Sequence, residues 1–322
     1  MADELIYSGL VTRTTGSWYN VLVNSGDSFA CRLRGNFRIR GNKQTNPIAV
    51  GDHVTFQLLD DGTGMITAVA DRHNCIIRRA TKLSKQTHVI AANIDQLCLV
   101  ATLGFPRTST GFIDRLLVTA EAYHIPAVLV FNKCDLYNAE LWQLHNEVKA
   151  IYEKVGYPVY EVSALTGRGI EKIKELVHGK VSLFSGHSGV GKSALLNAID
   201  PSLRLRTGDV SDWSLKGKHT TTFAEIFPLK LSTSNSQLST CLIDTPGIKE
   251  FGMVDFTAEE LSHFFPEMRS RLHDCHFANC THRHEPGCAI KAAVESGDIH
   301  PERYQNYLNI LESILSDAPI RR

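Results

Sequence analysis

The segment Gly-His-Ser-Gly-Val-Gly-Lys-Ser at residues 186–193 constrains the fold of this chain more tightly than any other. It fits the pattern G-x-x-x-x-G-K-[ST], in which glycines let backbone N–H groups curl around a β-phosphate. An apolar run at residues 181–184 precedes it, and a helical pattern at residues 194–199 follows it. This strand–loop–helix order, rather than a chance glycine-rich turn, predicts a nucleotide-binding α/β domain.

The residues of this segment have separate expected roles. Lys192 can reach the β- and γ-phosphates, so we also count it among the catalytic candidates, and the Ser193 hydroxyl can ligate Mg²⁺. The other expected nucleotide contacts in this segment are Gly186, His187, Ser188, Gly189, Val190, Gly191 and Ala194.

Two further segments are typical of a guanine site. NKCD at residues 132–135 ends an expected strand at 127–131, and Asp135 can accept both the N1–H and the N2–H of guanine, a donor pair that adenine lacks. SALTG at residues 163–167 ends the next expected strand, where its N–H groups can face guanine O6, although such a turn can also simply cap a helix. The expected guanine contacts are Asn132, Lys133, Cys134, Asp135, Ser163, Ala164 and Leu165.

A third pair of segments indicates a magnesium site and a γ-phosphate sensor. DTPG at residues 244–247 follows an expected strand, so Asp244 can hold Mg²⁺ through water and the Gly247 N–H can sense the γ-phosphate. GKHTTT at residues 217–222 offers hydroxyls for a further Mg²⁺ ligand. Thr221 is the expected ligand, with Thr220 as the alternative.

The order of these motifs is unusual. The guanine motifs precede the phosphate-binding loop and DTPG, whereas most small GTPases place the phosphate-binding loop first. A sheet tolerates such a permutation because chain termini can move between neighbouring surface loops. The order therefore predicts a circularly permuted P-loop GTPase domain, with a mostly parallel sheet and helices on both faces. The chain after DTPG leads directly into the C-terminal tail, so we expect nucleotide state to move that tail.

The residue that orients the attacking water is missing from its usual place. In Ras-like enzymes a Gln follows D-x-x-G, but here that position is Ile248, which cannot form a side-chain hydrogen bond. His219 in GKHTTT is the nearest polar candidate, and its pKa near neutrality suits a general base. Otherwise a partner supplies the group, and in either case we expect low basal activity.

A Cys/His cluster near the C-terminus indicates a metal site. The spacing C-x4-C-x-H-x5-C suits one tetrahedral, structural Zn²⁺, because four protein ligands leave no open position for catalysis. His276 or His284 could replace the histidine of this set. The expected ligands are Cys275, Cys280, His282 and Cys288.

The N-terminal region predicts a small barrel. Short strands separated by turn residues suit an OB-fold, and an SH3-like barrel would give almost the same pattern. The five expected strands are at residues 5–12, 18–23, 29–33, 52–59 and 64–69.

Basic residues gather in this region although the whole chain is neutral, with 34 Lys+Arg and 34 Asp+Glu. Two runs, at residues 31–43 and 72–85, contain no acid, and aromatic rings accompany the first, with Phe37 inside it and Phe29 just before it. Such a run can be a solvated loop, but on a barrel face it resembles a footprint for RNA phosphates. The candidate RNA contacts are Arg32, Arg34, Arg38, Arg40 and Lys43.

Nothing in the sequence indicates a membrane protein. No stretch approaches the ~18 consecutive apolar residues of a membrane span. The N-terminus lacks the basic-then-apolar pattern of a signal peptide, so we expect a cytoplasmic protein with reduced thiols.

Together the motifs in this order closely resemble the RsgA/YjeQ family of bacterial GTPases. The resemblance also includes VGDHV at residues 50–54 and AANIDQ at residues 91–96, and it covers nearly the whole chain. It implies an OB-fold at residues 1–75, a permuted GTPase domain at 76–255 and a helical zinc-binding domain at 256–322. It also implies GTP hydrolysis stimulated by the small ribosomal subunit, ribosomal RNA as the main partner, and we expect a monomer. The alternative is a GTP-regulated scaffold for a protein or transfer RNA.

Overall fold

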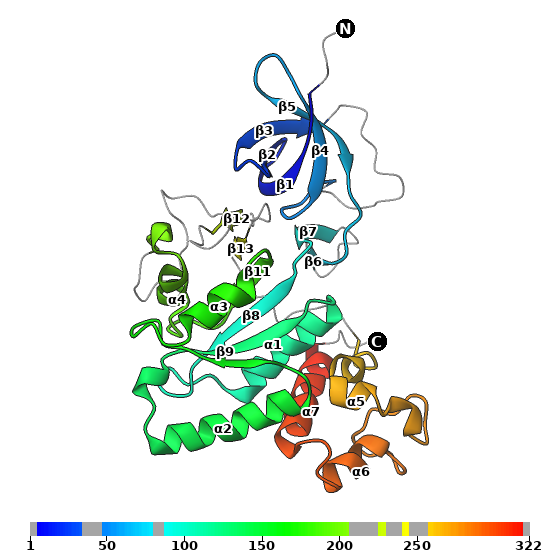
Figure 1. The fold of residues 1–322 in the computed structure, drawn as a ribbon. Coiled ribbons are helices and arrows are strands. Elements are labelled where there is room, and N and C mark those ends of the chain that lie inside the picture. The colour runs from blue at the N-terminus through cyan, green and yellow to red at the C-terminus, as the bar shows by residue number, and fades with distance from the viewer. Residues whose placement is uncertain are drawn as a thin grey trace.

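The computed structural model describes residues 5–33, 47–79, 87–205, 225–229, 240–244 and 257–317. Figure 1 shows a β-barrel at the top, a sheet flanked by helices in the middle, and a C-terminal helical module at the lower right. A two-stranded hairpin lies between the barrel and the central sheet.

The barrel is closed by five strands in the order β1-β2-β3-β5-β4, and β4 pairs back with β1. The β3–β5 pairing is parallel and the other four are antiparallel. This closed order confirms the OB-fold over the SH3-like alternative. Alternate residues fill the interior, among them Val11, Val21 and Phe56, which are fully buried. The strands are β1 (Ile6–Thr15), β2 (Trp18–Val23), β3 (Ser28–Leu33), β4 (His53–Leu58) and β5 (Gly64–Val69).

A hairpin that the sequence did not predict follows the barrel. It pairs β6 (Cys75–Arg79) with β7 (Thr87–Ala92) in antiparallel fashion. Between barrel and hairpin, the Arg72 guanidinium forms two bonds, of 2.6 and 2.7 Å, to the carboxylate of the fully buried Asp52. A bidentate, partly buried pair of this kind fixes direction as well as distance, so it holds the barrel to the chain that leaves it.

The central sheet has the order β10-β9-β8-β11-β13-β12. The first five strands are parallel, and β12 is antiparallel to β13. One pair, Arg13 opposite Glu225, continues the sheet into β1 of the barrel. The strands are β8 (Gln96–Ala101), β9 (Ala127–Phe131), β10 (Val159–Glu161), β11 (Val181–Ser185), β12 (Glu225–Pro228) and β13 (Cys241–Asp244).

Helices cover both faces of this sheet, as predicted. Leu97 and Leu99 of β8 pack into one apolar core with α1 (Thr110–Ala122) and α2 (Ala139–Lys154). Cys98 and Val100, which alternate with them, pack into a second core with α3 (Ile170–Val177) and α4 (Lys192–Ile199). Because successive strand residues point to opposite faces, these continuous apolar strands require a helix layer on each side. Two 3₁₀ turns, η1 (Cys134–Leu136) and η2 (Pro201–Leu203), complete this part.

The C-terminal module packs its own apolar core against the outer side of α1. Phe265, Met268, Ile290 and Leu311 are buried there together with Val118 of α1. The elements are η4 (Leu261–Phe264), α5 (Pro266–Arg269), η5 (Leu272–Asp274), α6 (Ala289–Glu295) and α7 (Pro301–Asp317).

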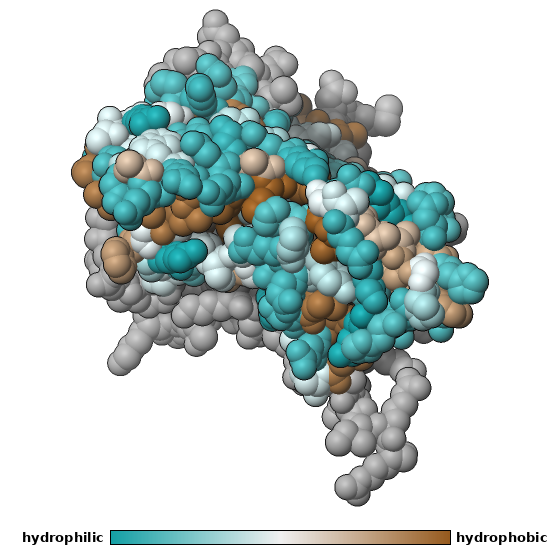
Figure 2. Space-filling view, turned by 90° about the horizontal axis from the view of Figure 1, so that it is seen from below, coloured by the Kyte–Doolittle hydropathy of each residue, from teal (hydrophilic) through white to brown (hydrophobic). Residues whose placement is uncertain are grey.

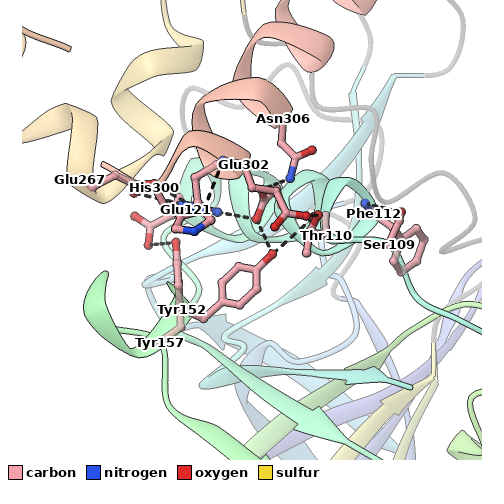
Figure 3. A network of polar contacts seen from close by, with 12 residues as sticks. Ser109, Thr110, Phe112, Glu121, Tyr152, Tyr157, Glu267, His300, Glu302 and Asn306 are labelled. Atoms are coloured by element: carbon pink, nitrogen blue, oxygen red, sulfur yellow. Dashed lines mark hydrogen bonds and ion pairs between the residues drawn. The ribbon is translucent and has the colours of Figure 1, made fainter. Parts of the chain in front are cut away.

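A buried ion-pair network joins this module to α1 and α2. The Arg303 guanidinium, 2% exposed, lies 2.5 Å from Asp114 of α1 and 2.7 Å from Glu267 of α5. Tyr152 and Asn306 also donate to the Asp114 carboxylate, at 2.8 and 2.7 Å. Figure 3 shows Tyr152, Glu267 and Asn306 converging from three different helices. Burial alone would lower the pKa of Arg303, but the two carboxylates raise it above its usual value, so Arg303 stays charged.

The surface is predominantly polar on the face seen from below in Figure 1. Hydrophilic residues cover most of this face, and hydrophobic residues form separate patches between them (Figure 2). None of the helices in the described ranges combines the length and the apolar character needed to cross a lipid bilayer.

Replacing Arg303 with Met should lower the free energy of unfolding by about 3–5 kcal/mol, because Asp114 would keep its burial and lose its cation. The matched control is Arg271→Met, which removes an exposed pair with Asp298 at 3.2 Å and should cost less than about 1 kcal/mol. Urea unfolding of both variants measures the difference. Equal losses would show that the buried pair does not hold the C-terminal module in place.

Candidate nucleotide-binding and metal sites

The expected nucleotide site lies along the carboxyl edge of the parallel strands. β9, β8 and β11 are neighbours in the sheet, so the loops that follow them lie side by side. These loops carry NKCD at residues 132–135, a connection at residues 102–109, and the phosphate-binding loop at residues 186–191. SALTG follows β10, the next strand outward. Ligand sites in open α/β sheets form at this edge.

Glycine is required at two points of the phosphate-binding loop. A Cβ at Gly186 would lie 2.2 Å from the carbonyl oxygen of Val100 in the neighbouring strand. Gly191 has a φ of +87°, and a Cβ there would lie 2.6 Å from the Asn132 side-chain nitrogen. The loop can therefore lie this close to β8 and to NKCD only without side chains at these positions.

The loop presents unpaired backbone donors. Within the described ranges, no acceptor is found for the N–H groups of Ser188, Gly189 and Val190. Next to them, the Lys192 ammonium donates to the carbonyl oxygens of Gly186, at 2.5 Å, and His187, at 3.3 Å. Backbone N–H groups together with a lysine at the start of α4 form a site suited to phosphate oxygens.

Asn132 joins the three loops of the site. Its side-chain nitrogen donates to the carbonyl oxygen of Val190 at 2.9 Å, and its side-chain oxygen accepts from the N–H of Ala164 at 3.1 Å. Asn132 is 1% exposed, so neither bond competes with bulk water. One amide therefore fixes the phosphate-binding loop and SALTG relative to NKCD.

The other predicted guanine contacts border this bridge. Lys133 has a left-handed φ of +64° and donates to the carbonyl oxygen of Phe105 at 3.2 Å. Asp135 is exposed in η1, and Leu165 in SALTG is 84% exposed. Cys134 and Ser163 are buried instead, at 2% and 0% exposure, so their side chains pack inside the domain beneath the loops. Asp135 and Leu165 are thus open to a ligand, whereas Cys134 and Ser163 would act mainly through their backbones.

Several predicted residues fall outside the described ranges. His219, Thr220, Thr221, Gly247 and Ile248 are among them, as is the segment that links DTPG to the C-terminal module. Asp244 ends β13, next to β11, so its backbone lies at the same sheet edge as the phosphate-binding loop. These assignments remain predictions.

The connection at residues 102–109 was missed by sequence reasoning. The Thr108 hydroxyl lies 2.7 Å from Nε2 of His187 in the phosphate-binding loop. The Phe112 ring meets the His187 ring edge-on, with centroids 5.5 Å apart. Only the position of this connection after an apolar strand hinted at a role, since it carries no nucleotide motif.

The predicted zinc ligands lie together. One ligand atom from each of Cys275, Cys280, His282 and Cys288 falls within 4.8 Å of the other three. Nδ1 of His282 is the atom that faces the thiols, at 3.4 Å from Cys288 and 3.7 Å from Cys275. Three sulfurs and one nitrogen at these separations fit a tetrahedral, structural Zn²⁺. The alternatives His276 and His284 are exposed.

Burial and hydrogen bonds shape the loop that carries these ligands. Burial raises the pKa of the Cys280 thiol to about 12, although a backbone hydrogen bond with His282 opposes this shift. A cation bound to the cluster would favour the thiolate. Tyr304 donates to the carbonyl oxygen of His282 at 2.6 Å. Glu285 accepts from the backbone and hydroxyl of Thr281. Burial opposes ionisation of Glu285, but these bonds lower its pKa to about 2, so the carboxylate is charged at neutral pH.

Of the five candidate RNA contacts, one lies within the described part of the barrel. Arg32 is exposed on β3, and its guanidinium lies 3.9 Å from the ring centre of Trp18 on β2. The stacking leaves an aromatic–cation pair on the barrel surface. Arg34, Arg38, Arg40 and Lys43 lie outside the described residues.

Two family matches cover most of the chain. Residues 69–254 match the family described as RsgA GTPase, and residues 8–66 match the family described as RsgA N-terminal domain.

Similar proteins cover nearly the full length. A protein of Bacteroides thetaiotaomicron named small ribosomal subunit biogenesis GTPase RsgA 2 is 50% identical over 304 residues, 94% of this chain and 96% of that protein. A Flavobacterium johnsoniae protein named small ribosomal subunit biogenesis GTPase RsgA is 49% identical over 308 residues, which are 95% of this chain and 93% of that protein. The crystal structure of YjeQ from Thermotoga maritima is similar with a TM-score of 0.79, 36% identity and coverage of 98% and 100%. The crystal structure of YloQ, described as a circularly permuted GTPase, is similar with a TM-score of 0.76 and 28% sequence identity, and the match covers 99% of each chain.

Asp135→Asn should weaken GTP binding and strengthen binding of xanthosine triphosphate. The amide replaces one of two acceptors with a donor, which opposes N2–H of guanine and suits the extra carbonyl of xanthine. We expect a loss of about tenfold or more for GTP, in line with the roughly 1–3 kcal/mol of a bidentate base contact. Fluorescence titration with labelled nucleotides measures both affinities, and unchanged GTP affinity would place the base elsewhere.

Cys280→Ala should lose the single zinc ion, whereas His284→Ala should keep it. The first variant removes one of four ligands and the second removes an exposed imidazole outside the cluster. Metal analysis of the purified proteins gives the stoichiometry, which should be one zinc per chain in the wild type. Full zinc in Cys280→Ala together with loss in His284→Ala would reject the ligand set.

Proposed function

This chain belongs to the RsgA family of GTPases, and from that premise we propose that it hydrolyses GTP while it acts in late maturation of the small ribosomal subunit. The observation that carries the nucleotide site is the Asn132 bridge, which assembles the guanine loops and the phosphate-binding loop into one surface. The most direct experiment measures GTP hydrolysis with and without purified small subunits. A rate that small subunits leave unchanged would contradict the proposal.

The described residues divide the work of binding. The N–H groups of residues 188–190 and the Lys192 ammonium bind phosphate oxygens and orient the terminal phosphoryl group. Asp135 selects guanine, while Lys133 lies over the base. Ser193 and Asp244, with Thr221, are the residues that would hold Mg²⁺, and the ion would supply positive charge to neutralise the charge that develops between the β- and γ-phosphates.

The residue that usually orients the attacking water is absent from its place in this chain. Ile248 stands where a Gln would orient the attacking water, so we assign that role to His219, with the Gly247 N–H on the γ-phosphate. Because one neutral imidazole must be placed accurately to act, the basal rate is low and the partner raises it by placing the imidazole against the attacking water.

The proposed partner is ribosomal RNA, bound mainly by the barrel. Arg32 stacked on Trp18 supports this, because such a pair can contact both a phosphate and an unpaired base. Arg34, Arg38, Arg40 and Lys43 extend the same basic run. We further propose that the protein works as a cytoplasmic monomer of three domains, at residues 1–75, 76–255 and 256–322.

His219→Ala should abolish stimulation by small subunits while GTP affinity and subunit binding stay within about twofold. The imidazole would act on the water and not on the ground-state nucleotide, so kcat falls without a matching change in affinity. Single-turnover hydrolysis with and without subunits provides the rates. A variant that is still stimulated normally would remove His219 from the mechanism and leave the catalytic group to the ribosomal partner.

A further inference from the structure

Hydrogen bonds at both ring nitrogens fix the orientation of the His187 side chain. The Thr108 hydroxyl accepts from the N–H of Thr102 at 3.0 Å and lies 2.7 Å from Nε2 of His187. The carbonyl oxygen of Ser188, 2.9 Å from Nδ1, can only accept, so Nδ1 carries a proton, and in the neutral tautomer Nε2 then accepts from Thr108. The imidazole thus connects Thr108 to the backbone of the phosphate-binding loop.

The bond to Ser188 sets the direction of a phosphate donor. The carbonyl of Ser188 and the N–H of Gly189 belong to the same planar peptide unit, in which the two groups point in opposite directions. Holding the carbonyl toward His187 therefore aims the Gly189 N–H away from His187. That N–H is one of the unpaired donors of the loop within the described ranges.

Thr108 is in turn held by the start of α1. Its own N–H donates to the carbonyl oxygen of Thr102 at 2.8 Å, and the next residue, Ser109, caps α1 by accepting from the N–H of Phe112 at 3.2 Å. Thr108 is 3% exposed, so it has little freedom to move separately from the helix. The position of the Thr108 hydroxyl follows the position of α1.

The first turns of α1 are fixed by the C-terminal module. Thr110 donates to the Glu302 carboxylate at 2.5 Å, and Asp114 accepts from Asn306 at 2.7 Å and from Arg303 at 2.5 Å. Figure 3 shows Thr110 beside Glu302, with Asn306 above, where α7 crosses α1. Gly111 allows this approach, because a Cβ there would lie 3.3 Å from Asn306 Oδ1.

The same helix α7 also holds the loop that carries the zinc ligands. Tyr304 donates to the carbonyl oxygen of His282 at 2.6 Å, and Tyr307 donates to that of Thr281 at 2.9 Å. Residues 302, 303 and 306 thus hold α1 while residues 304 and 307 hold the metal loop. One rigid helix contacts both.

We propose that His187 and Thr108 are positioning residues through which the zinc-binding module, acting by way of α7 and α1, sets the orientation of the phosphate-binding loop. The proposal rests on the proposed nucleotide site. Coupling between two sites is reciprocal, so a phosphate that binds the Gly189 N–H must also stabilise the metal loop. This route uses α1 and does not require the segment after DTPG.

Zinc transfer to a chromogenic chelator, measured with and without GDP, tests the coupling. GDP is set at 100 times the Kd that a fluorescent analogue gives for each protein. We expect GDP to slow zinc transfer about fivefold or more in the wild type, at the lower end of typical coupling. His187→Leu should reduce the effect below twofold. His187→Gln should retain it, because an amide can still accept from Thr108 and donate to Ser188. His73→Leu, the same change at an exposed histidine, should behave as wild type.

A second variant probes the coupling from the module. Asn306→Leu should speed GDP dissociation about fivefold, although residue 306 lies outside the nucleotide loops, whereas Gln305→Leu on the exposed side of α7 should not. Undiminished protection of zinc in His187→Leu, or wild-type GDP release in Asn306→Leu, would overturn the proposal. A wild-type protein that binds GDP without slowing zinc transfer would overturn it too. Failure of the wild type to bind GDP would instead overturn the nucleotide site itself and this inference with it.

Discussion

Parallel pairing of β10, β9, β8 and β11 is the constraint on which the nucleotide site depends. Parallel strands end at one edge of the sheet, so the four loops that follow them gather there whatever their order along the chain. The Asn132 amide then joins three of these loops by hydrogen bonds. A permuted chain can therefore assemble a guanine nucleotide site, because strand neighbours matter for the site and chain order does not.

Two polar clusters supplement the apolar core of the C-terminal module. The Cys/His cluster brings four side chains of residues 275–288 close enough to bind one metal ion, and Arg303 anchors the module on α1. Burying a charged pair rarely adds much stability compared with apolar side chains, but it tolerates few alternative geometries. We interpret the network as a means of fixing the angle at which the module docks, and the proposed coupling requires such a fixed angle.

The barrel and the C-terminal module are both attached to the central sheet and its helices. The barrel, at the top in Figure 1, meets it through the Arg13–Glu225 strand pair and through Leu10 and Val50, which are buried in the core of the central sheet. The C-terminal module meets it through α1, at the lower right. Both attached parts thus contact elements of the central domain that lead to the nucleotide edge.

Short-range patterns determined a large part of this protein. The phosphate-binding loop, NKCD and the C-x4-C-x-H-x5-C spacing each place their chemistry within a few residues, so the sequence alone identified the permuted GTPase fold and the four clustered metal ligands. Strand alternation likewise predicted five barrel strands, but it could not distinguish an OB-fold from an SH3-like barrel, since the two differ in which strands pair.

Tertiary structure decided the contacts between distant residues. Asp114 and Arg303 are 189 positions apart, and Thr108 and His187 are 79 apart, so no local periodicity marks either pair. The accepting role of Nε2 in His187 and the docking of α7 on α1 likewise arise only when the chain is folded. Local sequence carries propensity and motif chemistry, whereas a long-range polar contact is defined by two surfaces that only the packed fold brings together.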